Sequence, residues 1–159
     1  MINRLNIVKA VLMIFLIVFL VKLSTGDNAK DLDSKQLATV FQKDTAIQDL
    51  EVGNDRTLMK LYGIDSEEIP AYVLYYSQST MGVAELLVVK AEDGQMESIQ
   101  SQVQTRLDSQ KEAFDGYGAS QTELLNGSEI VTYGNYLFFG VSEQVENWKE
   151  EFLNGVKAS

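Results

Sequence analysis

The sequence predicts an α+β domain with a four-stranded, mainly antiparallel sheet, built from two hairpins and packed against helices. Two pairs of short runs rich in β-branched and aromatic residues, each pair divided by a turn, predict the hairpins. Residues 95–114 carry apolar side chains at three- and four-residue steps, which predicts a long helix. A similar pattern predicts a C-terminal helix, and two helices are expected before the first strand. The strand order stays open.

An apolar segment opens the chain. Residues 10–21 contain no polar side chain and are flanked by Lys9 and Lys22. At about 1.5 Å per residue this run spans roughly 18 Å of a hydrocarbon core about 30 Å thick, which favours a cleaved signal peptide. However, no Ala-x-Ala motif follows, and the segment reaches about 19 residues if both lysines extend toward the headgroups. We expect an uncleaved anchor; signal cleavage and a buried helix of a cytosolic domain are the alternatives.

The location follows from the charges around this segment. Basic residues precede it and Asp27, Asp31 and Asp33 follow it, so the positive-inside bias places the N-terminus in the cytoplasm. The rest is then a single-pass membrane protein's extracytoplasmic domain, or a secreted domain if the segment is cleaved. The expected division is an anchor or signal peptide at 1–23, a polar tether at 24–33 and one domain at 34–157.

Two helices are predicted ahead of the sheet. Ser34 is the expected N-cap of the first, and its apolar face holds Leu37, Phe41 and Ile47. Asn54 or Asp55 is the expected cap of the second, and Gly63 is placed to end it.

The strands and the remaining helices follow in order. Residues 71–78 and 83–91 predict the first hairpin, and the long helix comes after it. A capping box, Ser120-x-x-Glu123, predicts a short helix. The runs 130–133 and 136–141 predict the second hairpin, with Gly134-Asn135 as its tight turn. The last helix carries an apolar face of Val145, Trp148, Phe152 and Val156.

The composition excludes several functions. Beyond residue 26 the chain has 10 basic and 23 acidic side chains, a net charge of −13, which repels phosphate backbones and argues against a nucleic-acid partner. Cysteine is absent, so disulfides, a lipid-modified cysteine and thiol nucleophiles are excluded. Histidine is also absent, which removes Ser-His-Asp machinery and the commonest zinc ligand. We expect no metal, no cofactor and no catalytic residue.

Several short motifs resemble one bacterial family, domain of unknown function 4358. They are Leu61-Tyr62-Gly63-Ile64-Asp65, Tyr75-Tyr76-Ser77 through Ala84-Glu85, Lys90, Arg106, Gln110, Phe114, Tyr117 and Gly134-Asn135-Tyr136. The resemblance covers about residues 34–155 and implies a Gram-positive source and an extracytoplasmic domain behind a lipoprotein signal or a membrane segment. It implies no biochemical activity. This chain departs from the lipoprotein members because it lacks cysteine.

The candidate ligand-binding residues are Arg106, Gln110, Tyr76 and Tyr117. Arg106 and Gln110 stand one helical turn apart, so their polar ends can converge over the sheet as a small site. The favoured alternative is structural: Arg106 pairs with an acid such as Glu85, and Gln110 satisfies a loop carbonyl. The tyrosines near the strands can form an aromatic platform for a sugar or a peptide, although half-buried sheet tyrosines are commoner.

These observations favour a non-catalytic binding or interaction module at the bacterial cell envelope. Its expected partners are the membrane, through the N-terminal segment, and an envelope protein or a glycan. The alternative is a small envelope hydrolase that acts on glycan or peptide through carboxylates, because the chain holds 23 acidic residues.

Overall fold

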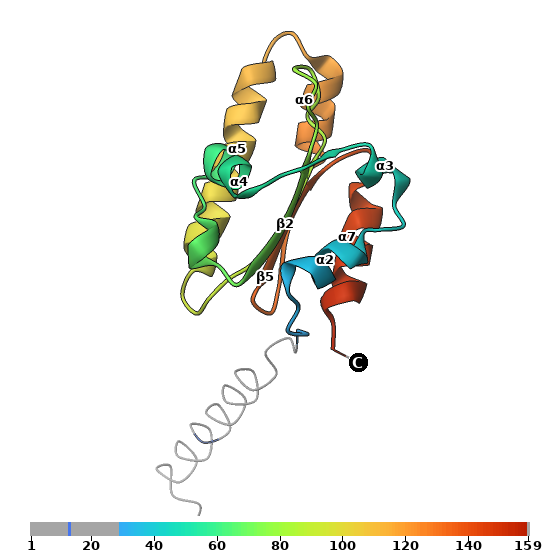
Figure 1. The fold of residues 1–159 in the computed structure, drawn as a ribbon. Coiled ribbons are helices and arrows are strands. Elements are labelled where there is room, and N and C mark those ends of the chain that lie inside the picture. Colours follow the sequence, from blue (N-terminus) through green and yellow to red (C-terminus); the bar gives the residue numbers. More distant parts are fainter. Residues whose placement is uncertain (1–12, 14–28, 159) are drawn as a thin grey trace, which may run out of the picture.

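The computed structural model describes Met13 and residues 29–158. Figure 1 shows the elements in their spatial arrangement. In chain order they are α2 (Ser34–Val40), α3 (Thr45–Gln48), β1 (Glu51–Val52), α4 (Asp55–Tyr62), a 3-10 turn (Ser66–Glu68), β2 (Ala71–Tyr76), β3 (Glu85–Lys90), α5 (Met96–Phe114), α6 (Ala119–Asn126), β4 (Glu129–Tyr133), β5 (Tyr136–Val141) and α7 (Val145–Val156).

The described part of the chain forms one antiparallel sheet of five strands in the order β1-β2-β3-β5-β4. The two predicted hairpins are β2-β3 and β4-β5, and they join through β3 and β5, where Leu87 lies opposite Phe139. The prediction of four strands is wrong by one. It missed β1 because this strand has only two residues, both exposed, and leaves no periodic pattern in the sequence.

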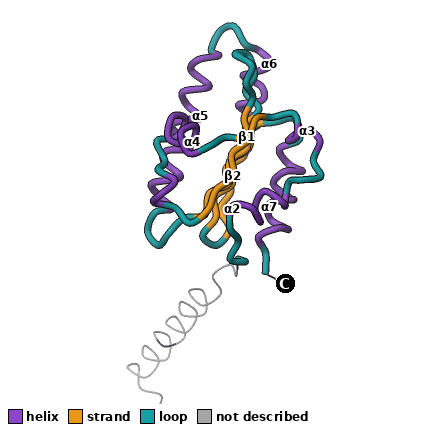
Figure 2. Tube along the Cα trace, viewed as in Figure 1, coloured by secondary structure: helices purple, strands orange, loops and turns teal. Residues whose placement is uncertain are grey.

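Helices cover both faces of the sheet (Figures 1 and 2). The side chains of α4, α5 and α6 pack on one face, and those of α2, α3 and α7 pack on the other. Strands β3 and β5 are therefore buried on both sides, which explains why their sequences are almost continuously apolar. The result is three layers with a hydrophobic cluster on each side of the sheet.

The first predicted helix is divided into two. The side chain of Asp33, one residue before the predicted Ser34, accepts a hydrogen bond from the Gln36 N–H and caps α2. This helix ends at Val40, and α3 begins only after Asp44, whose carboxylate caps it. The second helix agrees with its prediction: Asn54 caps α4, and Gly63 ends it with a φ of 68°.

Gly134 and Asn135 form the two-residue turn of the second hairpin, between the paired residues Tyr133 and Tyr136. Gly134 has a φ of 57°, whereas Asn135 has an ordinary negative φ. The turn is also tied to the end of the first hairpin, because the Ala91 N–H donates to the Asn135 C=O at 2.8 Å.

The chain enters the fold beside its own C-terminus. The Lys30 N–H donates to the Val156 C=O at 2.8 Å, and Ala29 forms an antiparallel bridge with Lys157. The hydroxyl of the buried Tyr136 donates to the Lys30 C=O at 2.9 Å. No helix in the described residues has the length and apolar content of a membrane span. The predicted anchor or signal peptide, Met13 apart, lies outside those residues.

Candidate functional site

Arg106 and Gln110 converge, and the residue on which they converge is Glu85. Arg106 of α5 forms a two-pronged ion pair with this carboxylate: Nη2 lies 2.7 Å from Oε2 and Nε lies 3.2 Å from Oε1. Gln110 donates to Oε2 at 3.3 Å, and the Tyr62 hydroxyl of α4 donates to Oε1. We refer to these four residues as the Glu85 cluster.

The Glu85 cluster is buried under α4 and α5. Glu85 is 2% exposed and Gln110 is 7% exposed, so the carboxylate has lost most of its contact with water. Burial, and then the charge of Glu85, raise the pKa of Tyr62 well above its usual value. Burial lowers the pKa of Arg106, but the hydrogen bonds and charge of Glu85 outweigh this effect and raise it overall. The cluster thus holds a cation, an anion and a neutral phenol together.

This arrangement matches the structural alternative for Arg106, which is the ion pair with Glu85. Gln110 differs from that alternative, because it donates to Glu85 and not to a loop carbonyl. Tyr62 was missed because its position in the helical pattern made it one of the apolar residues of α4. The described contacts therefore make the cluster a tie between α4, α5 and β3, with the Gln110 Oε1 atom buried and without a described partner.

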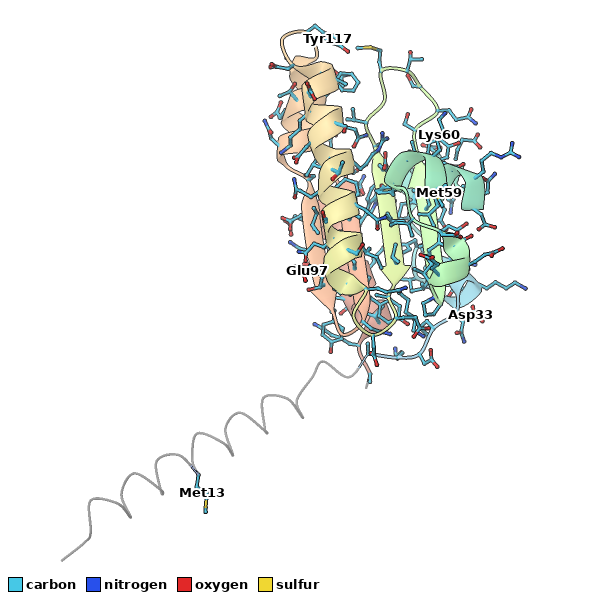
Figure 3. The ribbon with its side chains drawn as sticks, turned by 90° about the vertical axis from the view of Figure 1, so that its left-hand side faces the viewer. Met13, Asp33, Met59, Lys60, Glu97 and Tyr117 are labelled. Carbon is cyan, nitrogen blue, oxygen red and sulfur yellow. The ribbon has the colours of Figure 1, made fainter. Side chains whose placement is uncertain are left out.

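Tyr76 lies beside this cluster, whereas Tyr117 lies apart from it. Tyr76 is half-buried at the end of β2, where it is the cross-strand partner of Glu85. Tyr117 is 66% exposed in the turn between α5 and α6, at the end of the molecule shown uppermost in Figure 3. Its ring centroid lies 5.7 Å from that of Phe114. The structure thus brings three of the four candidate ligand-binding residues next to Glu85, namely Arg106, Gln110 and Tyr76.

A groove at the outer edge of β2 is the better candidate site. It has a volume of about 380 Å³ and lies between α2 and α4, at the sheet edge seen in Figure 2. Its floor is the run Tyr72–Tyr75 of β2, and an exposed Val52 (71%) of β1 stands at one end. We call it the β2 groove; its lining residues are Ser34, Lys35, Ala38, Val52, Gly53, Asp55, Tyr72, Val73, Leu74 and Tyr75.

Polar groups are fixed along the walls of the β2 groove. The Tyr72 hydroxyl donates to Asp55 Oδ1 at 2.6 Å, and Ser34 Oγ accepts from the Tyr72 N–H at 3.1 Å. Burial, and then the bond to Asp55, raise the pKa of Tyr72, so its hydroxyl stays protonated at neutral pH. Lys35 lies on the opposite wall. The groove therefore combines an apolar floor with a few oriented polar groups, which is typical of ligand pockets.

Gly53 shapes the end of the groove. Its N–H donates to the Leu74 C=O at 2.7 Å, and a Cβ at this position would lie 2.5 Å from the Leu74 side chain. Only glycine allows the chain to cross β2 this closely. In the sequence, Asn54 or Asp55 predicts the start of a helix here, and Gly53 was not among the predicted structural residues.

The family match covers the Glu85 cluster and most of the β2 groove. The model of a family described as Domain of unknown function (DUF4358) matches residues 43–142. The chain belongs to this family. The DUF4358 match includes the whole Glu85 cluster and the floor of the β2 groove, whereas the α2 wall with Ser34, Lys35 and Ala38 precedes it. No curated protein and no solved structure matches the chain.

Two other hollows of the DUF4358 domain are lined differently. One, of about 600 Å³, lies at the turn from α5 to α6 and includes Asp115, Tyr117 and Glu123. The other, of about 570 Å³, lies between α6 and α7 and includes Glu143 and Glu146. Both are lined largely by charged, polar and turn residues. Within residues 29–158, no group of three acidic side chains is arranged to hold a metal ion.

Proposed function

We propose that this chain is a non-catalytic binding module of the cell envelope, held at the membrane by its N-terminal segment with the domain on the outer side. The observation that carries the proposal is the β2 groove, where an apolar floor meets oriented polar groups. The basic residues before the apolar segment and the net charge of −13 after it support the location. Secretion after signal cleavage is the alternative location.

The groove has the dimensions and the chemistry of a binding site. Its volume of about 380 Å³ lies in the range of small-ligand pockets. Val52 is largely exposed beside it, and a bound partner would cover this side chain. Tyr72 and Asp55 would orient the partner by hydrogen bonds.

A hydrolase of the two-carboxylate type gains no support from the same groove. Such an enzyme places two carboxylates on either side of one scissile bond. Among the residues that line the β2 groove, Asp55 alone is a carboxylate, and it already accepts a hydrogen bond from Tyr72.

The test places a larger side chain in the groove and measures whether a binding partner is lost. Ala38→Gln puts a longer side chain into the groove without breaking α2, and Ala113→Gln makes the same change on the exposed side of α5. Full-length protein in detergent is immobilised and exposed to envelope extract at several salt concentrations. We expect wild type and Ala113→Gln to retain the same partner, and Ala38→Gln to lose it. Identical retention by all three proteins, or retention no better than by denatured protein, would refute the proposal.

A parallel incubation with cell-wall fragments checks the hydrolase alternative. We expect no turnover by wild type. Turnover that disappears in Asp55→Asn would replace the binding proposal with an enzymatic one.

A further inference from the structure

The β2 groove carries one charge of each sign, on opposite walls. Lys35 lies on the α2 wall and Asp55 on the α4 wall. Both residues are exposed, and among residues 29–158 neither forms an ion pair. Asp55 accepts a hydrogen bond from the Tyr72 hydroxyl, but a carboxylate can accept several more. The two charges thus cancel in sum and leave the groove with a positive wall and a negative wall.

The two charged residues also stand at the same level along β2. Ser34, the neighbour of Lys35, accepts a hydrogen bond from the Tyr72 N–H at 3.1 Å. Asp55 accepts one from the hydroxyl of the same tyrosine at 2.6 Å. Tyr72 therefore ties the start of α2 and the start of α4 to a single residue of the strand. A partner that presents a negative and a positive group at this level, in the reverse order, would satisfy both walls.

A second copy of the chain presents this arrangement. A two-fold axis that runs parallel to β2 in front of the groove exchanges the two walls and keeps every level along the strand unchanged. The α2 wall of each copy then faces the α4 wall of the other, and Lys35 faces Asp55 twice. An axis across the strands at this level would place like walls together, with Lys35 against Lys35. The charges therefore select the axis along the strands.

The position of the chain ends selects the same axis. Lys30 bonds Val156 at one end of the domain, and the strands run between this end and the end with the α5–α6 turn (Figure 1). An axis along β2 keeps the Lys30 end of both copies on the same side, as the proposed anchoring in one membrane requires. An axis across the strands would turn one copy upside down.

Exposed apolar surface lies between the charged walls. Val52 is 71% exposed at one end of the groove, whose floor is formed by the partly buried run Tyr72–Tyr75. In the two-fold arrangement β1 lies near the axis, so Val52 approaches its counterpart and both side chains are removed from water. Ala38 on the α2 wall is small, which allows the two walls to come close.

We propose that the partner of the β2 groove is a second copy of this chain, held by two Lys35–Asp55 ion pairs in a dimer whose two-fold axis runs along β2. This inference rests on the proposed function of the groove as a binding site and names its partner. The net charge of −13 beyond residue 26 of each copy opposes association. Anchoring in one membrane counters this repulsion, because it confines the copies to a plane and raises their effective concentration.

Cross-linking in the membrane tests the contact. The chain contains no cysteine, so Val52→Cys introduces a single thiol. Membranes that contain the full-length protein are treated with a short bis-maleimide reagent, and the dimer is measured by denaturing gel electrophoresis. We expect a dimer from Val52→Cys and none from Ala113→Cys, on the exposed side of α5. Ala38→Gln added to the Val52→Cys chain should lower the cross-linked fraction about tenfold, because it keeps the walls apart.

Charge reversal tests the pairing of the two walls. In the Val52→Cys chain, Lys35→Glu or Asp55→Lys places like charges at both pairs, and each should lower the cross-linked fraction about tenfold. When the two variants are produced together with different tags, a mixed dimer has opposite charges at both pairs. Cross-linking between the two tags should therefore return to the level of the unreversed chain, although neither variant cross-links well with itself. Variants that failed to fold could not give this recovery.

The outcomes separate this inference from the proposed function. If Val52→Cys gives no more dimer than Ala113→Cys while Ala38→Gln still loses an envelope partner, that partner is another molecule and the groove remains a binding site. A cross-link at position 52 that survives both charge reversals, or a mixture that does not recover, contradicts the two-fold pairing of Lys35 with Asp55. If no dimer forms and Ala38→Gln loses no partner, the proposed function fails as well.

Discussion

Glu85 shows how a carboxylate is kept inside this small domain. Moving a charge out of water costs several kcal/mol, and that cost is offset only by close partners with good geometry. Arg106 provides two such contacts, and Gln110 and Tyr62 bond the same two carboxylate oxygens. The cluster connects α4 and α5 to the first residue of β3, so it fixes the position of both helices that cover this face.

Substitution of Arg106 should show how far the stability of the fold depends on the ion pair with Glu85. Arg106→Met leaves the Glu85 carboxylate buried without its cation, and we expect the free energy of unfolding to fall by about 3–5 kcal/mol. Arg56→Met, on the exposed side of α4, removes the same charge and should change it by less than about 0.5 kcal/mol. Urea denaturation followed by the fluorescence of the single tryptophan measures all three proteins.

The double variant Arg106→Met with Glu85→Met checks the cause. Because it removes the unpaired charge as well, it should recover part of the lost stability, with Tyr62 and Gln110 then short of one partner each. A double variant that is as unstable as the sum of two independent losses would show that packing, and not the unpaired charge, explains the effect.

The sequence predicted part of the candidate sites at the residue scale. The four-residue step from Arg106 to Gln110 was enough to predict that their side chains converge, because helical geometry alone determines it. The β2 groove was not predictable in this way. It joins residues 34–38 to residues 72–75, and only the tertiary packing of α2 on the edge of β2 brings these segments together.

At the scale of elements, the contact between α3 and α7 includes a buried carboxylate oxygen of Glu151 without a described partner. The Trp148 indole N–H donates to Asp44 Oδ2 at 3.1 Å, so the carboxylate that caps α3 also binds α7. Glu151 lies one turn further along α7, and its Oε2 atom is buried without a described partner. Burial, and then the nearby charge of Asp44, raise the pKa of Glu151 above its ordinary value of 4.5.

The raised pKa of Glu151 makes the stability of the fold depend on pH. A folded-state pKa above the unfolded value means that the contribution of Glu151 to stability is complete below about pH 4.5 and is lost as the pH rises through the folded value. We therefore expect Glu151→Gln to raise the midpoint of thermal unfolding at pH 7 and to leave it nearly unchanged at pH 4. Glu150→Gln, an exposed neighbour with the same charge change, is the control. If both variants raise the midpoint of thermal unfolding equally at pH 7, the change in net charge explains the effect.

The elements differ in how far the sequence determines them. The hairpin β4-β5 and the helices α5 and α7 were predicted within one residue or so, because turn, period and length agree in each. β1 and the break between α2 and α3 were missed. Both depend on one or two residues, Gly53 and Asp44, whose effect appears only once neighbouring elements pack against them.

At the scale of the whole molecule, both ends of the described chain lie together at one end of the domain (Figure 1). Lys30 bonds Val156, and the fully buried Tyr136 holds the main chain of Lys30 and Leu32. Residues 29–33 are thus part of the folded unit. An anchored domain would therefore stand close to the membrane at this end, with Tyr117 and the α5–α6 turn at the far end (Figure 3).

The fate of the apolar segment decides whether the domain stays at the membrane. Because Lys22 closes the run and no Ala-x-Ala motif follows, we expect an uncleaved protein of about 17.8 kDa in the membrane fraction. Intact-mass spectrometry of protein from washed membranes measures this directly. A soluble chain that begins near Asp27 would show cleavage and make the groove part of a secreted protein. Protease added to intact cells should degrade the anchored domain, and full protection would reverse the orientation that the flanking charges indicate.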